Sequence, residues 1–72
     1  MHPNPSLPAT QCRAIRLAYV CELVGLSPAS IWRLTKTGEF PQPFPLTSSA
    51  TAWDEAEVRD WLTARKALRD GR

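Results

Sequence analysis

The chain has 72 residues and a formal net charge of +2. This length holds one small domain with a thin core, because a domain of roughly 60 residues buries only about 60% of the surface that its unfolded chain exposes. No run of residues approaches the roughly 20 apolar residues that span a bilayer, so we expect a cytoplasmic protein with no membrane partner. The small basic excess permits a polyanionic partner without requiring one.

The sequence offers little for metal or covalent chemistry. Cys12, Cys21 and His2 fall short of the roughly four nitrogen or sulfur ligands of a zinc site. No signal peptide is recognisable, so we expect both cysteines to be reduced thiols. The single histidine lies among prolines and no glycine-rich phosphate loop is present, so we expect neither an enzyme nor a bound cofactor.

Prolines mark the N-terminal end of the chain. Pro3, Pro5 and Pro8 stand among small polar residues, a composition that forms no helix and has little to bury. We therefore predict a disordered arm over residues 1–13, a domain over residues 14–69 and a frayed tail over residues 70–72.

A first short helix is predicted after Arg16. Apolar residues with the spacing of one helix face are Leu17, Val20, Cys21 and Val24. Gly25 follows the last of them and suits a left-handed helix end.

A second helix is predicted over residues 28–37. Ser27 is a good N-cap, Pro28 is favoured at the first helical position, and Gly38 suits the left-handed end. Ile31 and Leu34 should face the core. The outward positions are Ala29, Ser30, Trp32, Arg33, Lys36 and Thr37.

A hairpin should follow. Prolines stand at every second position, at 41, 43 and 45, which forbids helix and leaves alternate N–H groups free to pair with one neighbouring strand. Phe40, Phe44 and Leu46 share the face opposite these prolines. The polar run 47–49 predicts a turn, and Thr51 and Trp53 alternate into a returning strand.

A third helix should begin after Asp54. Asp54 as N-cap with Glu57 three residues later predicts a capping box, and Glu55 places a negative charge where the helix dipole favours it. Its predicted apolar face is Val58, Trp61 and Leu62, and cations near its end are Arg65, Lys66 and Arg69. We expect Trp53 and Trp61 to belong to the core, since a domain this small needs large aromatics to bury enough area.

These elements come with recognisable motifs. The motifs are Gly25-Leu26-Ser27, Ile31-Trp32-Arg33-Leu34, Gly38-Glu39-Phe40-Pro41, and Trp53 followed by Glu57-Val58 and Trp61-Leu62. Together, over residues 16–65, they resemble the AlpA-like family of phage and mobile-element regulators, which are related to excisionases. The resemblance implies a mainly α fold with a small β-hairpin: a winged helix-turn-helix of the MerR/excisionase type, with three helices and a two-stranded wing.

The resemblance also implies a role. Such proteins act as DNA-binding transcription regulators, or as excisionases that direct an integrase toward excision, and the sequence does not choose between the two. Relatives often carry Arg or Lys in the wing, whereas this wing tip has only Thr47, Ser48, Ser49, Ala50 and Thr51. Wing contacts should then be confined to hydroxyl and backbone donors.

We therefore predict a double-stranded DNA site on the second helix. The candidate DNA-binding residues are Ser27, Pro28, Ala29, Ser30, Trp32, Arg33, Lys36, Thr37, Arg16, Ser48 and Ser49. Arg33 is the strongest candidate, because arginine grips phosphate or the guanine O6 and N7 atoms bidentately. Trp32 has two interpretations, a phosphate contact or an aromatic lying over the core, and Lys36 is either a phosphate contact or a solvated helix-end cation. Arg13 and Arg16 could extend the contacts along the DNA backbone.

A second hypothesis is a protein-interaction module, in which Trp32 and the proline-rich hairpin form an apolar patch. A domain with few contacts also suggests copies of itself on adjacent DNA sites, or an integrase partner.

Overall fold

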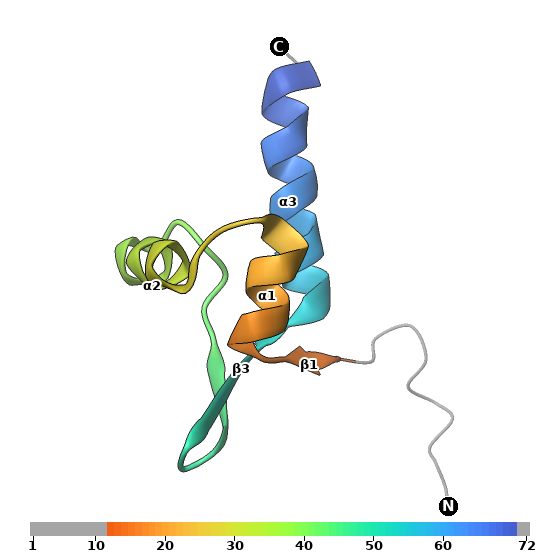
Figure 1. Cartoon of the computed structure of the whole chain (residues 1–72). Helices are drawn as coiled ribbons and strands as arrows, with labels where there is room; N and C mark the ends of the chain where they lie inside the picture. The colour runs from red at the N-terminus through yellow and green to blue at the C-terminus, as the bar shows by residue number, and fades with distance from the viewer. Residues whose placement is uncertain (1–11, 71–72) are drawn as a thin grey trace, which may run out of the picture.

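The computed structural model describes residues 12–70, in which three helices and three short strands form a winged helix-turn-helix (Figure 1). The elements are β1 (Ala14–Ile15), α1 (Leu17–Val24), α2 (Pro28–Thr37), β2 (Phe44–Thr47), β3 (Ala50–Asp54) and α3 (Glu55–Asp70). The predicted fold class is thus confirmed. The predicted arm lies outside the described residues up to position 11, and so do positions 71 and 72 of the predicted tail. Within residues 12–70, no helix is long and apolar enough to cross a membrane.

Local signals set the bounds of the helix-turn-helix. Gly25 and Gly38 end α1 and α2 with φ values of 76° and 83°, the left-handed region that glycine adopts without a Cβ penalty. Between them, Ser27 is extended and its Oγ accepts a hydrogen bond from the Ser30 N–H, while Pro28 occupies the first turn of α2. The predicted bounds of both helices are confirmed.

The sheet has one strand more than predicted. Its order is β1-β3-β2, with both pairs antiparallel, and β1 pairs Ala14 with Asp54 and Ile15 with Trp53. The predicted two-stranded wing is present as β2 and β3, and β1 is an additional strand that the sequence did not predict, because two residues are too short to show an alternating pattern. What holds β1 in place is tertiary: Ile15 is buried, and the Arg13 carbonyl accepts a hydrogen bond from the Glu55 N–H at 2.9 Å.

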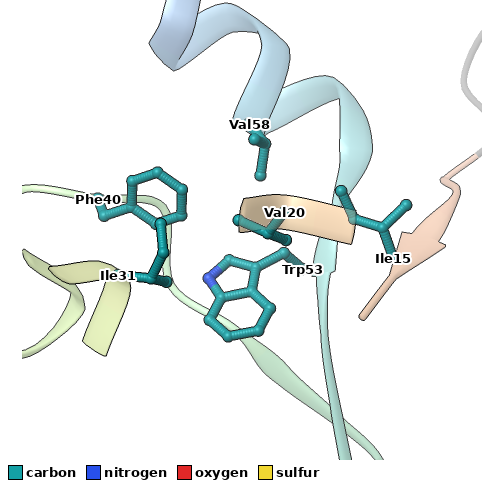
Figure 2. Close-up of a cluster of buried hydrophobic side chains, with 6 residues drawn as sticks. All are labelled: Ile15, Val20, Ile31, Phe40, Trp53 and Val58. Carbon is teal, nitrogen blue, oxygen red and sulfur yellow. The ribbon is translucent and has the colours of Figure 1, made fainter. Parts of the chain in front are cut away.

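The core lies where α1, α2, α3 and the base of the hairpin meet (Figure 2). Its buried members are Ile15, Val20, Ile31, Phe40, Trp53 and Val58. Trp53 is fully buried, as predicted, and its indole N–H donates to the Pro41 carbonyl at 3.0 Å, which ties β3 to the segment before β2. Trp61 is only half-buried; it packs edge-on against Phe40 with ring centroids 4.8 Å apart, and its N–H donates to the Glu39 carbonyl.

Charged side chains fix the start of α3. Asp54 caps the helix, as predicted, although its side chain accepts from the Ala56 N–H at 3.1 Å and not from the Glu57 N–H of the expected capping box. Glu55 bonds Arg59 at 3.1 Å and lies 3.4 Å from Arg13, with only 13% of its side chain exposed. This network joins the chain before β1 to the first turn of α3.

Candidate nucleic-acid interface

The outward side of α2 carries most of the predicted site. All of its predicted positions are exposed except Ser30, which is half-buried. The exposed ones are Ser27, Pro28, Ala29, Trp32, Arg33, Lys36 and Thr37. The inward side is held by Ile31, which is fully buried, and by Leu34, which is half-buried against the core. The helix is therefore anchored along one side and free along the other.

Three polar side chains of this face form a chain of hydrogen bonds. The Ser27 hydroxyl donates to Ser30 Oγ at 3.2 Å, and Arg33 Nη2 donates to the same oxygen at 3.4 Å. A contact of 3.4 Å on an exposed surface is a weak bond. It directs the guanidinium toward the first turn of α2 while leaving its other donors free for a phosphate or a guanine edge.

The first turn of α2 offers fewer backbone donors than a helix start usually does. Pro28 has no N–H, the Ser30 N–H is used by Ser27 Oγ, and the Ile31 N–H bonds the Ser27 carbonyl at 3.0 Å. The N–H of Ala29 is left without a bond to another of the described residues. Anion binding at this helix end thus depends on side chains more than on the backbone.

Trp32 connects α2 with the hairpin. Its ring lies 5.2 Å from that of Trp53, tilted by 54°, and 44% of the residue stays exposed. The ring therefore packs over the core, and the phosphate contact of Trp32 stays a prediction. The exposed part of the ring still adjoins the outward side of α2.

The wing formed by β2, β3 and their turn is neutral at its surface. No charged residue occurs between Glu39 and Asp54. At the tip Ser48 and Ser49 form the turn and are exposed, and Thr47 Oγ1 accepts the Ser49 N–H at 3.2 Å. The two predicted wing residues are therefore available to solvent but bring no positive charge.

Leu46 departs from the sequence pattern. It was grouped with Phe40 and Phe44, yet Phe40 is buried, Phe44 is half-buried and Leu46 is 47% exposed. The cause is a register shift: Pro45 pairs with Thr51 and Thr47 with Ala50, so Leu46 is an extra residue in a β-bulge. Alternation along the sequence could not reveal this bulge.

The remaining predicted cations are divided between two surroundings. Arg16 is exposed at the N-cap of α1, whereas Arg13 is held near Glu55 of α3.

Residues 12–38 carry four basic residues and one acidic residue, while residues 39–60 carry five acidic residues and one basic residue. The acidic part includes Glu57 and Asp60, which line a surface depression beside Phe40 and Gln42. A polyanion is thus favoured at α2 and disfavoured at the start of α3.

Metal ligands and thiols are the remaining side chains with chemistry of their own. Within 12–70, no group of three or more His, Cys, Asp or Glu residues is placed to hold a metal ion. Cys12 and Cys21 are both free thiols. Desolvation and the neighbouring charge of Asp54 raise the pKa of the Cys12 thiol, which keeps that thiol protonated and poorly nucleophilic.

A helix-turn-helix with a third helix and a hairpin wing defines the class, a winged helix-turn-helix protein with a polar recognition-type helix. Comparison of the sequence with known families agrees: the family described as "Prophage CP4-57 regulatory protein (AlpA)" matches residues 13–66. The chain belongs to this family of phage-type DNA-binding regulators. It is also similar to the "Uncharacterized protein ORF88" of Enterobacteria phage P4, with 40% identity over 67 residues, which are 93% of this chain and 74% of the relative.

Proposed function

We propose that the protein is a transcriptional regulator that binds a specific sequence in double-stranded DNA by placing α2 in the major groove. The observation that carries the proposal is the outward side of α2, where Arg33 and Lys36 are exposed, with Ser27 at the N-cap, on a helix anchored by Ile31. A recognition helix presents its N-terminal residues to base edges while flanking residues hold phosphates.

The positions along α2 suggest separate roles. Ser27 and Ser30 lie at the N-terminal end, where their hydroxyls meet base edges or nearby phosphates, and the Ala29 methyl suits a thymine methyl. Arg33 lies one turn further on and reads a guanine or grips a phosphate. Lys36 and Thr37 at the C-terminal end position the helix through the DNA backbone.

Arg16 adds a backbone contact from the start of α1. It is exposed and does not take part in the ion pair of Arg13 with Glu55.

Because one small domain makes few contacts, tight binding also calls for further copies on adjacent sites. The same contacts serve an excisionase that binds beside an integrase, so the mode of DNA binding is common to both roles.

The test is a titration with a duplex that the protein itself selects from a random-sequence pool. The two variants to compare are Arg33→Ala and Arg69→Ala, which remove the same charge. Arg69 lies near the end of α3 and pairs with its neighbour Asp70. If Arg33 reads a base, its loss weakens binding by about 1–3 kcal/mol, or roughly 5- to 150-fold, whereas Arg69→Ala changes affinity far less.

The dependence on salt separates this proposal from a second candidate. Trp32 and Leu46 are exposed apolar residues, 44% and 47%, which favours a protein-interaction surface as the alternative. Contacts to several phosphates make the logarithm of the binding constant fall steeply with the logarithm of salt concentration, and an apolar interface does not. Failure to select any duplex, or equal binding by wild type and Arg33→Ala at low and moderate salt, contradicts the proposed site.

A further inference from the structure

The wing exposes a large apolar side chain at a position where the strand pairing is interrupted. Leu46 is 47% exposed, although Trp53 on the other strand of the same hairpin is fully buried. It lies in the bulge between Pro45 and Thr47, a feature that changes the direction of side chains relative to the regular sheet. The wing thus presents an apolar side chain to solvent beside its turn.

The charge of the wing indicates what it can meet. Residues 40–53 include no charged side chain, so the side chains of the wing have no charge–charge attraction to phosphates and no repulsion from them. Hydroxyl groups flank Leu46 on its C-terminal side, at Thr47, Ser48 and Ser49. An apolar tip with small hydroxyl neighbours suits the minor groove, whose floor presents hydrogen-bond acceptors and whose base steps accept apolar wedges.

The edge of β2 argues against the addition of a strand from another protein. Strand addition needs a row of free backbone donors, and within the four residues of β2 Pro45 has no N–H to donate. The bulge interrupts the row again at Leu46.

The wing is also joined to α2. Trp53 of β3 lies against Trp32 of α2, with ring centroids 5.2 Å apart, and the Trp53 indole N–H is bonded to the Pro41 carbonyl. In Figure 1 the hairpin projects beyond the body of the domain, and the free end of α3 points the opposite way. Because this contact links α2 to the wing, placing α2 in the major groove also determines where the wing meets the DNA.

From these observations we propose that Leu46 enters the minor groove as an apolar wedge that partly unstacks one base step and kinks the duplex. This inference rests on the proposed DNA binding by α2 and adds a second contact, with its own effect on DNA shape. Wedges of this kind bend DNA by about 20–90°, and pyrimidine–purine steps such as TA and CA deform most easily. The wedge accordingly favours sites with such a step under the wing.

The experiment uses the full chain and the duplex selected in the titration above. The bend is measured by fluorescence energy transfer between the duplex ends, and unstacking by the permanganate reactivity of thymines. The variants are Leu46→Thr, which removes the apolar wedge, Leu46→Met, which keeps one, and Leu68→Thr as a matched control. Leu68 is 72% exposed near the end of α3.

Wild type, Leu46→Met and Leu68→Thr should bend the duplex and produce one reactive step. Leu46→Thr should lose roughly 20° or more of the bend, together with that reactivity, while retaining salt-sensitive binding through α2. Circular dichroism confirms that each variant is folded.

Two outcomes overturn the inference, and they differ from each other. Equal bending and reactivity for Leu46→Thr and wild type refute the wedge while leaving DNA binding by α2 in place. A wild-type protein that binds no duplex refutes the proposed function and the wedge with it. A wild-type protein that binds DNA without bending it also refutes the wedge.

Discussion

Replacing Trp32 with alanine tests whether the hairpin and α2 are one packed unit. An aromatic side chain buries about 150–250 Å² when fully covered. With 44% of Trp32 exposed, about 80–140 Å² is buried, which stabilises the fold by about 2–3.5 kcal/mol at roughly 25 cal/mol per Å². The contact with Trp53 adds about 0.5–1.5 kcal/mol. Alanine is the better helix former, which reduces the expected loss of stability by about 0.5 kcal/mol. The unfolded chain is itself partly compact, so the area that folding buries, and its contribution to stability, are smaller than these figures imply.

The expected loss is therefore about 2–3 kcal/mol. A domain of about 60 residues has only about 3–9 kcal/mol of stability in total, so Trp32→Ala should be close to unfolding. The assay is urea denaturation followed by far-ultraviolet circular dichroism, with Trp32→Phe as the conservative variant and Lys36→Ala as an exposed control on the same helix. A loss for Trp32→Ala no larger than the roughly 0.5 kcal/mol expected of the exposed control would refute the packing argument.

Three further variants test the local signals that shape the fold. Ser27→Ala removes the N-cap of α2 and should cost about 1 kcal/mol in the same denaturation assay; no measurable loss would mean that the cap does not stabilise the helix. Gly38→Ala should cost about 1–2 kcal/mol because φ is +83°, and since no atom lies within 4 Å of the added Cβ, the cost should come from the backbone alone. A loss well above that range would reveal a steric clash. Arg13→Ala breaks an ion pair whose arginine is 70% exposed, so we expect less than about 1 kcal/mol in stability and little change in DNA affinity. A loss of affinity as large as that for Arg33→Ala would place Arg13 in the DNA interface.

Local sequence signals predicted the helix-turn-helix in detail. Gly25, Ser27-Pro28 and Gly38 act within one turn of themselves, so their effect is readable without knowledge of the rest of the fold. The same holds for Asp54 as an N-cap. Which backbone N–H donates to its carboxylate depends on the path of the chain from β3 into α3.

The parts that sequence reasoning missed depend on contacts between distant residues. Strand β1 exists because Ile15 reaches the core and pairs with Trp53, 38 positions along the chain. The bulge at Leu46 arises from the pairing of β2 with β3, where alternation alone puts Leu46 on the side of Phe40. The position of Trp32 over Trp53 is likewise a tertiary contact. The sequence alone was compatible with both a phosphate contact and packing over the core for Trp32.

The separation of charge along the chain bears on how the protein reaches its target. The chain has a positive excess before Gly38, a negative excess between Glu39 and Asp60, and a second positive excess over residues 61–70. Within the screening length of about 8–10 Å at physiological salt, the field of a duplex turns such a molecule before any contact forms. An encounter would then begin with one of the two basic regions, α2 or the C-terminal half of α3, facing the phosphates, and the uncharged wing would make contact only afterwards. Association would be fast and steered, with the choice of sequence made in the slower second stage.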